Sequence, residues 1–259
     1  MIELTPTDLE IINKVTNKYL NVHHINLSSG SYYIKFCSEE EALKELLGKR
    51  IFDIAGIYCP KYVYLKDKKC VISEDLNQLP NFKYINEFKF LKSVTLDTVI
   101  NKICKEVSNP DEIVLHLNIM HFIDILFSNT DRHTKNYGLS LDAKRNAQLI
   151  VFDNGMLLEH LDFVTKPVSF RLANFNSPKS SECDLFLKNL SEEHKEILFQ
   201  LFDKFDPENV QIILNSFEKE YGLKFESKNK LLKNYIKNYK NLLFIINKHR
   251  QINIIKKLV

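Results

Sequence analysis

Tryptophan is absent from this chain of 259 residues, and glycine and proline are scarce, with 6 and 7 copies. So little glycine and proline excludes collagen-like, elastic and low-complexity linker proteins. The chain also lacks an apolar run of about 18 residues, so the sequence predicts no transmembrane helix. Its first residues include acids and no apolar stretch, unlike a secretory signal. These absences predict a soluble, cytoplasmic protein.

Cysteines are few and scattered. The five, an odd number, form no CxxC pair: Cys37, Cys59, Cys70, Cys104 and Cys183. This spacing predicts reduced thiols, and it excludes a disulfide framework and a zinc site built from paired cysteines. An apolar fraction of 44%, with 18 Phe and 11 Tyr, suffices for a sizeable core. A wholly disordered chain is therefore excluded.

Charge is unevenly distributed along the chain. Residues 224–259 contain ten Lys or Arg and one acid, whereas the rest contains 26 basic and 32 acidic residues. A basic segment is more often the solvated face of a helix, and the alternative is a surface for an anionic partner. Direct binding of nucleic acid has no other support in the sequence and is not expected.

The first 93 residues combine strand and helix patterns. An aromatic-rich run at residues 31–36 predicts a strand after a polar turn. Apolar side chains three or four apart over residues 39–55 predict a helix, with Ser38 as N-cap and Gly56 as the stop. Residues 62–65 and 69–73 predict a hairpin. We interpret residues 74–93 as a connector between two lobes.

The remaining residues, 94–259, have mostly helical patterns. Asn109 and Pro110 mark the start of a strongly apolar helix. Two short strands are expected at 137–141 and 149–152, then an irregular segment to about residue 178, then helices to the end. The whole pattern predicts an α+β fold with a small mixed strand and helix N-lobe, residues 1–93, and a mostly helical C-lobe, residues 94–259.

Three polar side chains surround the second predicted hairpin. Asp131 and Asn136 lie in the loop before it, and Asp153 follows its last strand. Phosphoryl transfer uses such a set, because one carboxylate orients the attacking hydroxyl while a carboxylate and an amide hold Mg²⁺. Alternatively, these residues only form turns, which Asn and Asp favour. The context of apolar helix, polar loop and hairpin favours the first interpretation.

The N-terminal region offers complementary residues. Lys35 lies in an otherwise apolar strand, and Glu45 on the next helix is a candidate partner for it. In protein kinases such a pair positions nucleotide phosphates. Alternatively, Lys35 points to solvent from an edge strand. The turn before the strand could cover phosphates with backbone N–H groups, or be an ordinary turn; it consists of Ser28, Ser29, Gly30 and Ser31. At the lobe junction, Glu74, Asp75 and Leu76 would offer backbone groups to adenine.

The order of these motifs resembles the HipA-like branch of the protein-kinase superfamily. The matching patches are YYIKF with Glu45 ten residues after its lysine, NTDRHTKNYG, and VFDNG. The resemblance covers about residues 28–160. It implies a two-lobed protein-kinase-like fold that binds ATP and Mg²⁺ in the cleft between the lobes.

The resemblance also implies a role for each matching residue. Lys35 would contact the α- and β-phosphates, and Glu45 would hold Lys35. Asp131 would act as catalytic base or orient the hydroxyl, and Lys135 would neutralise charge on the transferred phosphoryl group. Asn136 and Asp153 would bind Mg²⁺.

The implied activity is an ATP-dependent serine/threonine protein kinase of bacterial, toxin–antitoxin type. Its substrate would be a protein with a Ser or Thr acceptor, and an antitoxin-like or regulatory protein is a candidate partner. Some members of the family phosphorylate themselves in the phosphate-covering loop, which makes Ser28, Ser29 and Ser31 candidate acceptors. Two alternatives stay open: a lipid or small-molecule kinase, and a pseudokinase that binds a partner.

Overall fold

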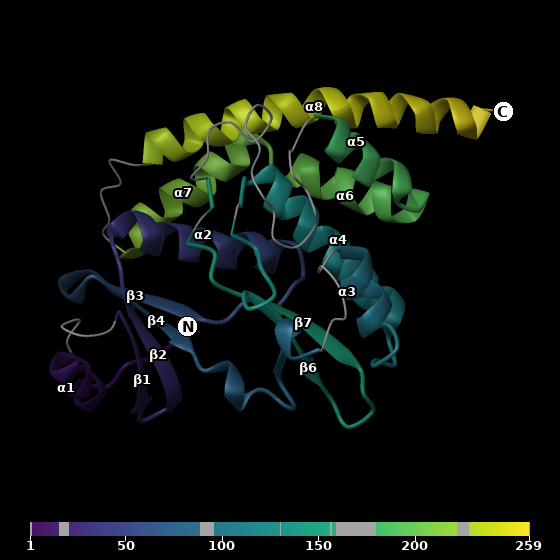
Figure 1. Ribbon diagram of the computed structural model, residues 1–259. Helices are drawn as coiled ribbons and strands as arrows, with labels where there is room; N and C mark the ends of the chain where they lie inside the picture. The colour runs from purple at the N-terminus through teal and green to yellow at the C-terminus, as the bar shows by residue number, and fades with distance from the viewer. Residues whose placement is uncertain are drawn as a thin grey trace.

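The computed structural model describes residues 2–15, 21–88, 96–129, 131–155, 157–158, 180–221 and 228–258. A sheet-rich part of the molecule lies on one side and a stack of helices on the other (Figure 1). The boundary predicted between residues 93 and 94 lies outside the described residues, as does most of the irregular segment before residue 178. Within the described part of the chain, no helix combines the length and hydrophobicity that crossing a membrane requires.

Four antiparallel strands form the first sheet, in the order β1-β2-β4-β3. Their bounds are β1 (Val22–Leu27), β2 (Gly30–Phe36), β3 (Tyr62–Leu65) and β4 (Cys70–Glu74). The central position of β2 places Lys35 opposite Val71 of β4. Helix α1 (Pro6–Lys14) packs Ile12 against apolar side chains of this sheet, including Ile34. The strand predicted at residues 31–36 and the following hairpin are confirmed.

Helix α2 (Glu39–Ile54) begins and ends as predicted. The Ser38 side chain accepts the backbone N–H of Glu41, and the Glu41 carboxylate accepts the Ser38 N–H, which completes a capping box. At the other end Gly56 takes a φ of +76°, a conformation that glycine adopts without a steric penalty. The helix therefore has a fixed length and a fixed position beside β2.

A second sheet has the order β5-β6-β7, with bounds β5 (Lys83–Tyr84), β6 (Tyr137–Leu141) and β7 (Ala147–Val151). The predicted hairpin is confirmed. The segment interpreted as a connector also contributes β5, a two-residue strand too short to produce a sequence pattern. It further contains two short 3₁₀ turns, Leu76–Gln78 and Ile85–Glu87.

Helix α4 (Pro110–Leu126) is the central helix of the C-lobe. It begins at the predicted proline, but the side chain of Asn109 does not cap it. Instead Asn109 accepts the backbone N–H of Ala147 at 2.7 Å and donates to its carbonyl at 2.9 Å. The predicted N-cap residue therefore joins the start of α4 to β7.

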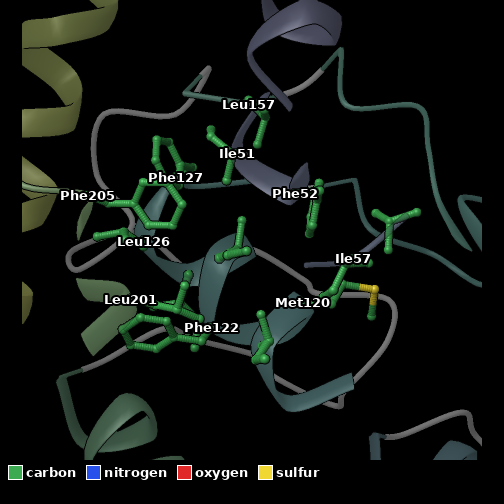
Figure 2. Packing of buried hydrophobic residues seen from close by; sticks show 14 of the residues in the cluster. Ile51, Phe52, Ile57, Met120, Phe122, Leu126, Phe127, Leu157, Leu201 and Phe205 are labelled. Carbon is green, nitrogen blue, oxygen red and sulfur yellow. The ribbon is translucent and has the colours of Figure 1, made fainter. Parts of the chain in front are cut away.

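The bounds of the other helices are α3 (Leu96–Ile103), α5 (Ser180–Asn189), α6 (Glu192–Lys204), α7 (Pro207–Tyr221) and α8 (Lys228–Leu258). Helices α3, α6 and α8 pack against α4. Figure 2 shows buried side chains of α2, such as Phe52, and of α4, such as Met120 and Phe122, within one cluster. These residues belong to one large core that joins helix α2 of the N-lobe to the helices of the C-lobe. That shared core holds the two parts in a fixed relation.

Helix α8 holds the C-terminal end of α4. Asn238 donates its amide hydrogens to the carbonyls of Ile125 and Leu126, at 2.8 and 2.7 Å. The last carbonyls of a helix lack partners within it, so this contact caps the helix. One face of α8 is lined by buried apolar side chains, and Tyr235 on it stacks on Phe127 with ring centres 4.7 Å apart. The buried asparagines on that face were not foreseen.

Candidate active site

Lys35 lies between two carboxylates. Its Nζ donates to Glu45 Oε1 at 2.9 Å and to Asp153 Oδ1 at 3.1 Å. The ammonium group of Lys35 thus joins strand β2 to helix α2 and to the segment after β7. The alternative, in which Lys35 points to solvent from an edge strand, is wrong, because β2 is an inner strand and the ammonium group is ion-paired.

Burial and charge act in opposite directions on this cluster. Burial alone lowers the pKa of Lys35, but the carboxylates of Glu45 and Asp153 more than reverse that effect and raise it above its usual value. Burial raises the pKa of Glu45, and the nearby Lys35 ammonium opposes that shift. The two carboxylates therefore favour the protonated form of Lys35, a third of whose side chain is exposed.

A cleft of about 260 Å³ opens beside Lys35. Its lining combines apolar and aromatic side chains with a few polar groups, as small-molecule sites do. The polar lining residues are Lys35, Glu45, Ser73, Glu74 and Asp153, and the apolar and aromatic ones include Tyr33, Tyr62, Leu76, Tyr84 and Phe152. The cationic group of Lys35 thus shares one cleft with several aromatic and apolar side chains.

The segment after β7 is held tightly against α2. The backbone N–H of Asn154 donates to Glu45 Oε2 at 2.7 Å. Gly48 allows this approach, because a Cβ atom there would lie 2.4 Å from the Cβ of Asn154. Asp153 itself has a φ of +53°, a left-handed conformation that is uncommon outside glycine but is tolerated by aspartate. Its side chain is half exposed and faces the cleft.

The loop between α4 and β6 carries Asp131 and Asn136. The Asn136 amide donates to the backbone carbonyl of Asp131 at 2.8 Å, which closes the loop on itself. The backbone carbonyl of Asn136 accepts the N–H of Phe152 at 3.1 Å, next to Asp153. Asn136 is buried, the Asp131 carboxylate is nearly half exposed, and Lys135 is exposed.

Arg132 connects these pieces. Its guanidinium pairs with Asp124 of α4 and donates to the carbonyls of Asn136 and Phe152, at 3.1 and 2.8 Å. It also donates to Asn154 Oδ1 at 2.7 Å. Arg132 is almost completely buried and lies over the ring of Phe52. One side chain therefore fixes both the loop that carries Asp131 and the segment that carries Asp153.

The four residues of the β1–β2 turn do not line the cleft. Ser28 donates its backbone N–H and its hydroxyl to the buried Asp8 carboxylate of α1, both at 2.7 Å. Ser29 bonds to the hydroxyl of Tyr32, and Ser31 donates to Asn26. Gly30 has a φ of +142°.

The three residues at the lobe junction differ in placement. Glu74 and Leu76 line the cleft, while Asp75 does not. The Glu74 carboxylate accepts the Tyr58 hydroxyl at 2.6 Å, and Asp75 is 3.0 Å from a ring nitrogen of His24. Their side chains are thus occupied by contacts within the N-lobe.

The side chains that would hold Mg²⁺ suit that ion. Asp153 offers a half-exposed carboxylate, and the Asn136 amide oxygen is an acceptor, because the amide nitrogen already donates to Asp131. These are hard oxygen ligands, and Mg²⁺ completes its shell with water and substrate phosphates. In the described ranges no group of three or more His, Cys, Asp or Glu could hold a metal.

Sequence reasoning assigned no role to Arg132, Asp124 or Asn154. The sequence did contain a signal for the pairing of Asp124 with Arg132. Asp124 lies within the apolar run of α4, and a carboxylate there needs a partner. The nearest basic residue after it is Arg132, eight residues later.

Comparison with known proteins identifies the fold. No protein-family model and no curated protein sequence matches the chain. The structure of the Helicobacter pylori proinflammatory kinase CtkA matches 90% of this chain and 95% of its own, with a TM-score of 0.64 and 17% identity. HipA from Shewanella oneidensis, in its complex with HipB and operator DNA, matches 95% of this chain and 73% of its own, with a TM-score of 0.58 and 11% identity.

The chain has a HipA-like, protein-kinase-like fold. At identities this low the likeness establishes the architecture alone. The predicted α+β class and the predicted HipA-like architecture are confirmed. Within this kinase-like fold, what the site does must be argued from its own residues.

Proposed function

We propose that the chain is an ATP- and Mg²⁺-dependent phosphotransferase that acts on serine or threonine hydroxyls of proteins. The observation that carries the proposal is the ion-paired Lys35, which lies in the cleft with Asp153 and is joined through Arg132 to the loop of Asp131 and Asn136. Phosphoryl transfer depends mostly on positioning and on compensating charge. The kinase-like fold supports the same conclusion.

Each residue has a defined task in this proposal. Lys35 binds phosphate oxygens of the nucleotide, and Glu45 keeps the Lys35 side chain in place. Asn136 and Asp153 would hold Mg²⁺, which would supply positive charge that offsets the charge of the phosphates. Asp131 accepts a hydrogen bond from the attacking hydroxyl, and Lys135 reaches the transferred phosphoryl group from the exposed edge of the loop. The adenine lies against the apolar wall, near the backbone of Glu74, Asp75 and Leu76.

The acceptor and partner are proposed from the resemblance to HipA-like proteins. A protein hydroxyl is the expected acceptor, and a regulatory protein is the expected partner. Self-modification, if it occurs, would involve the β1–β2 turn. There Ser28 is hydrogen-bonded to Asp8 through both of its donors, while Ser29 lies at the exposed tip.

The test is transfer of labelled γ-phosphate from ATP to the chain itself, to mixed protein acceptors and to lipid or small alcohol acceptors. Replacing Asp131→Asn or Asp153→Asn should lower transfer by about 100-fold or more, as expected for loss of a group that acts on the reacting atoms. Asp67→Asn, at an exposed turn outside the cleft, is the matched control. Label on serine or threonine supports the proposal, and label only on lipid or small alcohols assigns a different acceptor. Full transfer by Asp131→Asn, or nucleotide binding without any transfer, contradicts it.

A further inference from the structure

Helix α8 has an unusual charge composition. Its 31 residues include nine Lys or Arg and no Asp or Glu. Other helices of the chain pair charges internally, as α2 does with Lys49 and Asp53, or α5 with Lys188 and Asp184. Like charges three or four residues apart repel each other on a helix. Helix α8 therefore carries unbalanced repulsion along its length.

Four of these lysines and one phenylalanine form a line on the exposed face, which we call the α8 stripe. The stripe consists of Lys230, Lys233, Lys237, Lys240 and Phe244, and all five residues are exposed. Their spacing of three or four residues places them on one face over a length of about 20 Å. Phe244 is 78% exposed, the highest value among the large hydrophobic residues of the described chain.

Cations beside the stripe are paired with the protein body. Lys228 bonds to Glu218, Lys248 to Asp184, and Arg250 to Asp203. These contacts attach α8 to α5, α6 and α7. By contrast, the described residues provide no ion-pair partner for Lys230, Lys233 or Lys240. Paired cations thus attach the helix, while Lys230, Lys233 and Lys240 are exposed on its outer face.

The position of α8 makes the stripe accessible to a large partner. The helix runs along the edge of the molecule on the side away from the β1–β4 sheet (Figure 1). We propose that the α8 stripe binds an anionic membrane surface, with the lysines at the headgroups and Phe244 inserted among them. A basic helix with an exposed aromatic residue binds in this way, lying in the plane of the interface.

A membrane fits these observations better than a nucleic acid does. The stripe contains no arginine, the residue preferred for recognising phosphates and bases. The one arginine of α8, Arg250, lies outside the stripe and is paired with Asp203. A straight row of lysines suits a surface of diffuse negative charge, and an apolar ring next to them adds burial that a phosphate backbone does not offer. The surface is separate from the Lys35 cleft, so this proposal does not depend on the proposed phosphotransfer.

The experiment is co-sedimentation of the full chain with vesicles of phosphatidylcholine alone or mixed equally with phosphatidylserine. We expect binding to the mixed vesicles only, and release by high salt. The double variant Lys233→Glu/Lys240→Glu should lower the apparent affinity by about tenfold or more, because each lysine near an anionic surface contributes measurably. Phe244→Ser should weaken binding to the mixed vesicles at low salt, because the variant no longer buries an apolar ring at the membrane interface.

A matched control reverses the same amount of charge elsewhere. Lys83→Glu/Lys144→Glu changes two exposed lysines of the second sheet and should bind as the wild type does, and thermal melting of each variant confirms that it is folded. Equal binding to both vesicle types, an unaffected stripe variant, or equal loss in the control overturns the proposal. Binding of a polynucleotide without binding of vesicles overturns it as well and assigns the stripe to nucleic acid.

Discussion

Arg132 and Asp124 form an ion pair from which water is excluded, with side chains 0% and 1% exposed. The Asp124 carboxylate also accepts the Asn129 amide at 2.9 Å, while the guanidinium reaches across to Asn154. The pair therefore joins helix α4 to both polar segments of the candidate site. Burial of two charges is unfavourable unless every donor and acceptor is satisfied, and here the surrounding amides and carbonyls satisfy them.

Removing one member of this pair should strongly destabilise the protein. Asp124→Ala leaves the Arg132 guanidinium buried without its counter-charge, and we expect a loss of about 3–5 kcal/mol in the free energy of unfolding. Urea denaturation measures it. Asp67→Ala, at an exposed turn, should change the same quantity by no more than about 0.5 kcal/mol. Equal effects of the two substitutions would show that the buried pair has no special importance.

Gly48 and Gly56 provide a matched pair of substitutions at helix α2. A methyl group at Gly48 would overlap Asn154, whereas nothing lies within 4 Å of the same position at Gly56. Gly48→Ala should cost about 1–3 kcal/mol and also displace Asn154, next to Asp153, lowering nucleotide affinity. Gly56→Ala should cost about 1 kcal/mol through its positive φ and leave nucleotide affinity unchanged. Denaturation and nucleotide titration separate the two outcomes, and equal affinities would refute the packing argument.

Phosphotransfer should depend on Lys35 itself and not on the presence of any lysine on this side of the molecule. Lys35→Met removes the cation between Glu45 and Asp153 and should lower the transfer rate by about 100-fold, as loss of a preorganised charged donor does. Glu45→Gln keeps a hydrogen-bond acceptor for the ammonium and should reduce the rate less. Lys49→Met on the exposed side of α2 is the control. If the Lys49 and Lys35 variants were equally active, Lys35 would have no part in transfer.

The Asp8 carboxyl group should make the free energy of unfolding depend on pH in the acidic range. Hydrogen bonds from the Ser28 and Thr5 backbones lower the pKa of Asp8 below its usual value. A carboxyl group whose pKa is lower in the folded state stabilises the protein above its unfolded pKa of about 3.9, and that contribution is lost as the pH falls further. The stability difference between wild type and Asp8→Asn should therefore be largest near neutral pH and shrink below about pH 4. A difference that does not change with pH would contradict this origin.

Local sequence rules were sufficient for the elements that frame the site. The N-cap at Ser38, the helix stop at Gly56 and the aromatic-rich strand β2 each depend on neighbouring residues, so a single sequence reveals them. The ion pair of Lys35 with Glu45 was also foreseeable, since the two residues are ten positions apart on adjacent elements.

Long-range contacts were not foreseeable in the same way. The reach of Arg132 to Asn154, the closeness of Gly48 to Asn154 and the bond from Ser28 to Asp8 join residues that are far apart in the chain. None of these contacts produces a periodic pattern in the sequence. Asn109 illustrates the same limit, because its side chain bonds to nearby Glu112 and also to the backbone of distant Ala147 in β7, and only the first contact is local. The sequence therefore indicated which residues have chemistry to offer, and the fold determines which of them meet.

Thermal melting with and without Mg²⁺ and ATP, on wild type and on Asp153→Asn, tests the central claim most directly. A ligand at about 100 times its dissociation constant stabilises a fold by roughly 2.7 kcal/mol, which at this chain length raises the melting temperature by several degrees. The account predicts a metal-dependent rise for the wild type and a much smaller rise for Asp153→Asn. No rise at saturating nucleotide, or the same rise for both proteins, would contradict the assignment of Mg²⁺ and ATP to this cleft.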